Sequence, residues 1–218
     1  MKGFEFWKWI DSFFLNPLRI IRKNLFNSIV KNKHYIYWNV LDFWCWEKPY
    51  KNLFKFDSYE GLDYPKTWHD NRKNDIEIYW DWKTIPRKDE FYDSFICTEV
   101  FEHLFDLNSA VSEIYRVLKK WGYWIITLPF VFWEHEIPYD FARYTYFWIE
   151  YILKNHWFKI EKHFRIWNSW STLLQLHRLN IWNFFNKIRI KNRIIRNIFL
   201  WPFFILFQIL FNSLSNSL

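Results

Sequence analysis

The stretch Asn39–Tyr50 constrains the fold more than any other part of the chain. Its apolar run, which includes the β-branched Val40, ends at Asp42 and then turns. This pattern predicts the first strand and loop of a nucleotide-binding α/β unit. Such a loop normally needs glycine, because the backbone turns tightly and a ligand must approach main-chain N–H groups without a Cβ in between. Both positions where glycine is expected hold tryptophan, as Trp44 and Trp46.

When Trp44 and Trp46 are read as glycine, the stretch becomes V-L-D-F-G-C-G-E-K-P-Y. It then resembles the first motif of class I S-adenosylmethionine-dependent methyltransferases, of the type 11 methyltransferase domain. The resemblance implies in-line methyl transfer from the sulfonium of S-adenosylmethionine. It also places Asp42, Trp44, Cys45 and Trp46 in the cofactor-binding loop. Two indoles would overpack this close-contact site, so we expect weak or no activity of the tryptophan-containing chain.

The composition indicates that tryptophan also replaces glycine elsewhere in the chain. It has 17 Trp and 3 Gly, whereas about 7% Gly, roughly 15 residues, is usual for this length. We hypothesise that UGA codons, which the source organism reads as glycine, were translated as tryptophan; the alternative is a naturally tryptophan-rich homologue. Trp121 and Trp157 follow predicted helices, where a left-handed residue is expected. The full set of candidate positions is Trp38, Trp44, Trp46, Trp68, Trp80, Trp82, Trp121, Trp124, Trp133, Trp148, Trp157 and Trp167, with Trp170 and Trp182 expected to be genuine.

Two acids follow the next predicted strands. After a first helix over 50–56, a strand over 58–64 carries Asp63 at its end, about 20 residues past the loop, where a carboxylate can accept hydrogen bonds from both ribose hydroxyls. The alternative is a solvated turn acid. A strand over 75–79 precedes Y-W-D-W-K-T-I-P, which, read with glycines, is similar to the family's third motif. This resemblance implies that Asp81, next to Trp82, meets the adenine amino group.

The following segment, T-E-V-F-E-H, matches the E-V-x-E-H pattern that is common in this family. It places Glu99 in the cofactor site. The apolar spacing predicts a helix over 108–118, with Asn108 or Ser109 as N-cap and a Glu113–Arg116 pair. The remaining elements are expected to be strands over 91–97, 123–128 and 158–166 and a helix over about 146–155. No clear seventh strand is visible.

Residues 129–145 form a long predicted loop at the carboxyl end of a strand, where ligands bind in such sheets. We therefore expect Glu134, Asp140 and Arg143 to face the substrate. Asp140 and Arg143 lie one helical turn apart, so they could form an ion pair, or Arg143 could hold a substrate anion. Both readings stay open.

A hydroxyl acceptor must lose its proton, and a histidine suits that task near neutral pH. His103 and His135 are the candidate catalytic bases. We expect no metal; the alternative is a hard divalent ion such as Mg²⁺, which relatives with an E-x-x-E-H pattern use. Its ligands would be Glu99, Glu102, His103 and His135. Without metal, Glu99 and His103 would line the cofactor pocket and Glu102 would be structural.

The net charge of the chain is +7, and the excess of basic residues is concentrated in its C-terminal third. No RNA-binding signature accompanies it, so a membrane surface or an anionic substrate is expected rather than nucleic acid. Residues 187–213 combine basic and apolar stretches, which predicts a peripheral membrane contact or, alternatively, a helix packed on the domain. Cys45 and Cys97 look like buried free thiols and no signal peptide is seen, so a cytoplasmic, membrane-associated protein is expected.

The sequence thus predicts an α/β protein with a Rossmann-like, doubly wound, mostly parallel sheet of six or seven strands. Its expected parts are an amphipathic helical cap over 1–33, a methyltransferase domain over 34–168 and a basic, apolar helical segment over 169–218. The expected acceptor is a small molecule, a glycan or a lipid-linked group. The alternative function is a catalytically inactive, membrane-associated binding module whose cofactor loop is blocked by Trp44 and Trp46.

Overall fold

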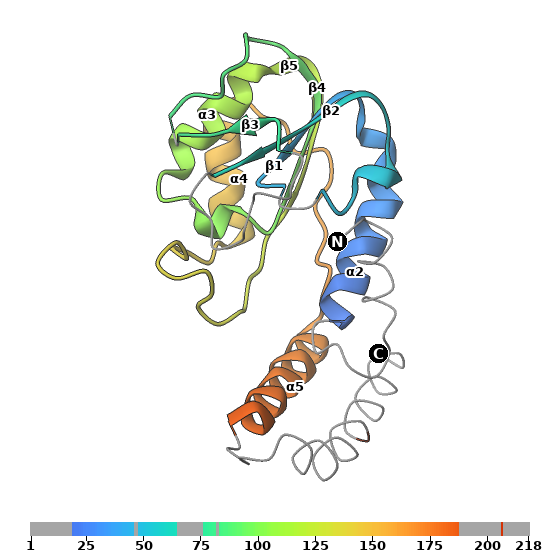
Figure 1. Ribbon diagram of the computed structural model, residues 1–218, viewed down its shortest axis with the longest axis vertical. Coiled ribbons are helices and arrows are strands. Elements are labelled where there is room, and N and C mark those ends of the chain that lie inside the picture. The colour runs from blue at the N-terminus through green and yellow to red at the C-terminus, as the bar shows by residue number, and fades with distance from the viewer. Residues whose placement is uncertain (1–18, 46–47, 65–75, 82, 188–205, 207–218) are drawn as a thin grey trace. The chain divides into compact units, whose positions relative to one another are not determined.

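The computed structural model describes residues 19–45, 48–64, 76–81, 83–187 and 206. Residues 29–163 form one compact unit, and the described residues before and after this range belong to a second one. The first unit holds a five-stranded sheet and two helices packed against it (Figure 1). It contains every described residue that the sequence places in the cofactor or acceptor site.

Every neighbouring pair of strands in the sheet is parallel, and the strand order is β3-β2-β1-β4-β5. The strands are β1 (Tyr37–Phe43), β2 (Lys55–Asp63), β3 (Ile78–Tyr79), β4 (Tyr92–Thr98) and β5 (Leu118–Thr127). Six of the seven residues of β4 are buried, as expected for a central strand covered on both faces. The predicted fold class is confirmed, with five strands among the described residues instead of six or seven.

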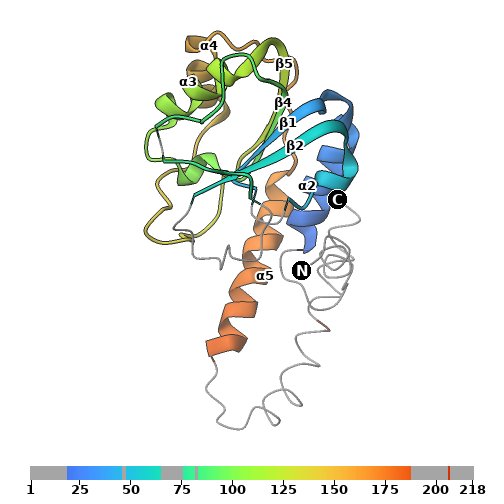
Figure 2. The same ribbon diagram turned by 45° about the horizontal axis from the view of Figure 1, so that its top comes forward.

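Two helices, α3 (Leu107–Val117) and α4 (Tyr146–Asn155), lie side by side on one face of this sheet (Figures 1 and 2). The apolar stripe of α3 recurs at helical spacing, and all of its members are buried: Leu107, Ala110, Val111, Ile114 and Val117. The bounds of α4 agree with the predicted helix. The other helices are α2 (Arg19–Asn32), the 3₁₀ turn η1 (Lys33–Tyr35) and α5 (Ser169–Lys187).

The helix predicted over 50–56 is wrong. This region forms only a 3₁₀ turn, η2 (Lys51–Leu53), and β2 already begins at Lys55. Seven residues are too few for a helix to be stable by itself, whereas Lys55 and Phe56 gain hydrogen-bonded partners in β1. The second strand is therefore longer than predicted and the third, β3, is shorter.

The junction between α3 and β5 also differs from the prediction. The helix ends at Val117, and Leu118 is already extended and pairs with Tyr92. Trp121 consequently lies inside β5 and not at a helix end. The N-cap is Asp106, whose carboxylate accepts the N–H of Ser109 at 3.1 Å, rather than Asn108 or Ser109.

The strand predicted over 158–166 is not present. Phe158 and Ile160 pack against the core, but the segment forms no ladder with β5. The alternating apolar residues of this segment are therefore explained by packing against the core and not by pairing in the sheet.

Most of the predicted terminal features lie outside the described residues. These include residues 1–18 of the predicted cap and residues 188–205 and 207–213 of the predicted membrane contact. None of the helices in the described part of the chain is long and apolar enough to cross a membrane.

Candidate active site at the carboxyl edge of the sheet

The site lies where the carboxyl ends of the parallel strands meet. The chain leaves β1 towards β2 on one side, while β4 pairs with β1 on the other side. This arrangement makes a topological switch point, the usual ligand position in an open parallel sheet. Trp44, Asp63 and Glu99 all directly follow or end strands at this edge.

Asp42 is held within the sheet next to this edge. Its carboxylate accepts a hydrogen bond from the hydroxyl of Tyr59 at 2.6 Å and is buried. Burial raises the pKa of Asp42 to about 7, an effect that the Tyr59 hydrogen bond and the charge of Lys48 only partly offset. Cys45 is buried close by, and its N–H donates to the carbonyl of Leu62 at 3.1 Å.

Trp44 has a backbone conformation that favours glycine. Its φ is 58°, in the left-handed region, which is costly for a residue with a Cβ. Its ring centroid lies 5.9 Å from that of His103 and 6.4 Å from that of Tyr64. The indole therefore stands above the end of β1, where a ligand would approach the backbone. Trp46 lies outside the described residues.

Two further tryptophans share this conformation. Trp38, with φ of 55°, stands at the register shift of β1 against β2. Trp157, with φ of 64°, follows α4, where its N–H donates to the carbonyl of Lys154 and the N–H of Phe158 donates to that of Leu153. These two bonds define a Schellman motif, whose left-handed position is usually glycine.

Other predicted glycine positions do not have this geometry. Trp121 is not among the described residues with positive φ. Trp80 is buried, and Trp124 packs against Phe95 and Phe101. The rings of Trp80 and Trp124 thus make core contacts, although the Nε1 of Trp124 is buried without a hydrogen-bond partner among the described residues.

The two acids predicted to bind the cofactor, Asp63 and Asp81, differ in burial. Asp63 is buried, and one of its carboxylate oxygens accepts the N–H of Tyr64 at 2.7 Å. Its carbonyl accepts the N–H of Trp80 at 3.0 Å, which brings the segment after β3 beside it. Asp81 is exposed and caps its own turn, where hydrogen bonds from Thr84 and Lys83 lower the pKa of its carboxyl. Trp82 lies outside the described residues.

Glu99 follows β4 and has a φ of 55°. Its N–H donates to the carbonyl of Thr127 at 3.0 Å, which joins the ends of β4 and β5. Burial raises the pKa of its carboxyl to about 7, an effect that the charge of Arg143 partly counters. A strained backbone at a partly buried acid is typical of functional sites.

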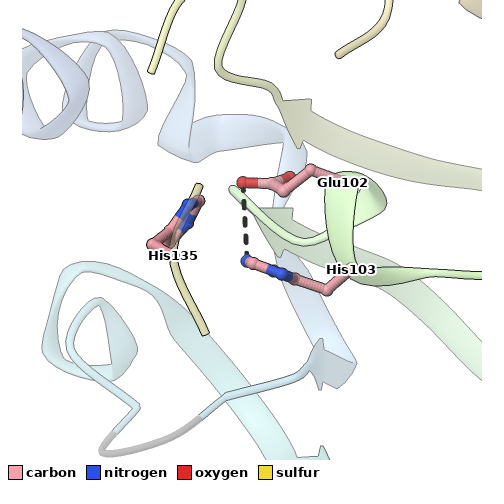
Figure 3. A group of neighbouring side chains, drawn as sticks. All are labelled: Glu102, His103 and His135. Atoms are coloured by element: carbon pink, nitrogen blue, oxygen red, sulfur yellow. Dashed lines mark ion pairs between the residues drawn. The ribbon is translucent and has the colours of Figure 1, made fainter. Parts of the chain in front are cut away.

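A cluster of one acid and two imidazoles lies beside this edge. Glu102 and His103 belong to the 3₁₀ turn η4 (Phe101–His103), and His135 comes from the loop after β5 (Figure 3). One potential ligand atom from each lies within 4.8 Å of the others. Burial raises the pKa of Glu102 well above its usual range and lowers the pKa of His103.

The loop over 129–145 is held by an ion pair and by the η4 turn. Arg143 contacts both carboxylate oxygens of Asp140, at 2.5 and 2.9 Å, so the predicted pair is confirmed. Burial would raise the pKa of Asp140, but hydrogen bonds from Arg143 and from the backbone of His135 hold it at about 2. The N–H groups of Phe141 and Ala142 donate to the carbonyl of Glu102. Glu134 is exposed.

Sequence reasoning missed two residues that organise the site. Tyr59 holds Asp42 from 17 residues away, and the carbonyl of Tyr139 faces the Nδ1 of His103 from 36 residues away. Neither position carries a local signal, because both partners meet only through the sheet and the loop.

A family model described as a methyltransferase domain matches residues 50–126. Among solved structures, the chain is similar to a SAM-dependent methyltransferase from Archaeoglobus fulgidus, with 14% identity over 78% of this chain and 92% of that chain and a TM-score of 0.49. A SAM-dependent methyltransferase from Aquifex aeolicus shows 15% identity over 74% and 91%, with a TM-score of 0.45. A Haloferax volcanii protein solved with the Trm112 methyltransferase activator shows 16% identity over 67% and 76%, with a TM-score of 0.47.

For three further solved structures, the chain spans 63%, 50% and 52% of their length. No curated protein matches the chain. Residues 50–126 thus match a methyltransferase domain, the parallel sheet order agrees with class I, and the cofactor of this class is S-adenosylmethionine. The resemblance seen in the sequence is therefore confirmed.

Proposed function

We propose that the natural protein transfers a methyl group from S-adenosylmethionine to a small-molecule, glycan or lipid-linked acceptor, and that it carries glycine at positions 44 and 46. The observation that carries the proposal is the left-handed backbone of Trp44 directly after β1. A glycine there would remove the indole from the switch point and relax the backbone at the same time.

The other residues at this edge suit the cofactor. Asp63 ends β2 and is the proposed ribose ligand, Asp81 is proposed for the adenine end, and Glu99 lines the site after β4. The loop after β1 does not suit the cofactor, because the Trp44 indole takes up space beside His103 and Tyr64. We therefore expect the tryptophan-containing chain to bind the cofactor weakly or not at all.

The chemistry needs little covalent help from the protein. S-adenosylmethionine supplies a methyl group on a sulfonium, so an acceptor lone pair forms the new bond as the C–S bond breaks. The chain positions the acceptor and excludes water. The loop over 129–145, fixed by Asp140 and Arg143, is proposed to cover the acceptor. His103 and His135, whose ring centroids lie 4.8 Å apart, are proposed to take up the acceptor proton.

The first test is the mass of the native peptide spanning residues 34–51, isolated from the source organism. Glycine at 44 and 46 is expected; tryptophan at both would refute the recoding. In parallel, calorimetry should show S-adenosylmethionine binding to the Trp44→Gly, Trp46→Gly chain and at least about tenfold weaker binding to the tryptophan form. The Trp121→Gly chain is the matched control, because Trp121 lies within β5, away from the loop.

A rival function is a binding module that has lost the cofactor. It would be favoured by tryptophan in the native peptide together with absent cofactor binding by the double-glycine chain. Membrane association is a separate proposal for residues 187–213, tested by liposome co-sedimentation before and after deletion of residues 194–218. Unchanged co-sedimentation after the deletion would refute it.

A further inference from the structure

We propose that Glu102, His103 and His135 bind a divalent transition-metal ion of the zinc class beside the cofactor loop. Figure 3 shows the carboxylate and the two imidazoles turned towards a common region. The Oε1 of Glu102 and the Nε2 of His103 are 3.8 Å apart. Ligand atoms about 2.1 Å from a tetrahedral zinc ion lie roughly 3.4 Å from one another. The Glu102–His103 pair therefore needs a small contraction, and the pairs that include His135, which lie within 4.8 Å, need a larger movement of the loop side chain.

Glu102 supplies an independent observation. Its side chain is 1% exposed, and neither carboxylate oxygen has a hydrogen-bond partner among the residues that the structure describes. A buried carboxylate without a donor is costly, and such groups are rare in folded proteins. A bound cation would provide the missing partner for both oxygens.

The hydrogen bonds of the two histidines leave the Nε2 lone pair of each ring available to bind a metal ion. His103 has its Nδ1 at 2.8 Å from the carbonyl of Tyr139, which can only accept, so Nδ1 carries the proton and Nε2 the lone pair. The Nδ1 of His135 faces two acceptors, the carbonyl of Trp133 at 3.2 Å and the carboxylate of Asp140 at 3.1 Å, and one more distant donor, the guanidinium of Arg143 at 3.4 Å. The two nearer acceptors favour a proton on the Nδ1 of this ring. Its Nε2 is therefore also available. Metal-binding histidines are commonly oriented by such bonds from the second ring nitrogen.

The composition of this group selects the kind of ion. Two imidazoles and one carboxylate suit zinc and similar ions, whereas magnesium prefers oxygen ligands. Glu99, which the E-x-x-E-H spacing would include in a magnesium site, is not part of the group. Its left-handed backbone places it outside the η4 turn that carries Glu102 and His103.

Three protein ligands would leave one coordination position for an acceptor oxygen. This role rests on the proposed function of methyl transfer, but the two histidines would then hold the ion and would not take up the proton themselves. A metal-bound hydroxyl would release its proton to water more readily and then carry the attacking lone pair. The ring contact between His103 and Trp44 places the group next to the cofactor loop.

The test is a zinc titration of the full chain by calorimetry, without cofactor or acceptor, followed by cobalt substitution and visible absorption. We expect one zinc per chain and a tetrahedral cobalt spectrum. Glu102→Gln, His103→Asn and His135→Asn should each weaken zinc binding by at least about tenfold. His156→Asn is the matched control and should bind like the parent, because His156 lies at the end of α4, outside the group.

Absent zinc binding, binding that none of the three substitutions weakens, or tighter binding of magnesium would each overturn the proposal. Circular dichroism checks the fold of every variant, and His135→Asn, in a half-buried loop, decides the question if Glu102→Gln does not fold. A cofactor titration of the same substitutions in the Trp44→Gly, Trp46→Gly chain separates the two proposals. Zinc failure with cofactor binding intact would overturn only the metal site, and the reverse result only the cofactor assignment.

Discussion

Replacing Trp157 with glycine should stabilise the protein, because the side chain contributes little and the backbone conformation is costly. Trp157 follows α4 with a φ of 64°, and its side chain is 82% exposed. A left-handed residue with a Cβ costs about 1–2 kcal/mol. Glycine has greater freedom in the unfolded chain, which costs about 0.5–1 kcal/mol.

The difference predicts a net gain of about 0.5–1 kcal/mol in the free energy of unfolding of Trp157→Gly. For a chain of this size, that gain corresponds to a rise in Tm of about 1–4 °C. Urea unfolding followed by circular dichroism, together with a thermal scan, would measure both quantities on the full chain.

Two matched variants test the physical reason. Trp157→Ala keeps a Cβ and should give none of the gain. Trp121 is 89% exposed but lies within β5, so Trp121→Gly should lose about 0.5–1 kcal/mol. A loss of stability in Trp157→Gly, or an equal gain in Trp121→Gly, would refute the argument from left-handed geometry.

Three further predictions concern charged groups. The folded pKa of Asp42, about 7, lies above its unfolded value, so the parent should lose about 2 kcal/mol of stability between about pH 5 and about pH 7. Asp42→Asn should reduce this slope in urea midpoints by the share of Asp42 and leave the part that the raised pKa values of Glu99 and Glu102 contribute; an unchanged slope would contradict the assignment. Asp106→Ala should cost about 1 kcal/mol by removing the cap of α3, and Asp106→Asn much less; equal losses in urea unfolding would contradict the cap. Arg143→Met leaves Asp140 buried without its bidentate partner and should cost about 1–3 kcal/mol, whereas the double change with Asp140→Leu should recover part of this loss; no recovery in urea unfolding would speak against the pair.

The elements that the sequence predicted well are those whose signals are local. The helix α4 begins after Thr145, whose hydroxyl accepts the N–H of Trp148, and ends at a left-handed residue. The ion pair of Asp140 with Arg143 likewise depends only on a spacing of three residues. Such features are decided within one or two turns of chain.

The errors arose where pairing across the sheet decided the outcome. Lys55 and Phe56 looked like the end of a helix but pair with β1, and Leu118 looked helical but pairs with Tyr92. Apolar and polar residues alternate over 158–166 as in a strand, yet this segment pairs with no strand of the described sheet. Ladder partners lie far away in the chain, so a local pattern could not reveal them.

The site was predicted in its residue types but not in its grouping. The spacing of Glu99, Glu102 and His103 suggested one helical face, whereas the chain turns sharply at Glu99 and only the last two share the η4 turn. The second histidine, His135, reaches the group from the loop after β5. Its approach depends on Asp140 and Arg143, which act only in the folded protein.

The three left-handed tryptophans have a consequence for making this protein in a foreign host. Trp38, Trp44 and Trp157 together would cost about 3–6 kcal/mol of backbone strain, which is comparable to the total stability of many domains, about 5–15 kcal/mol. A host that inserts tryptophan at these codons would then produce a chain close to its folding limit. Low yield or aggregation of such a preparation would reflect the translation table of the host, and a gene rewritten with glycine codons should yield the soluble protein.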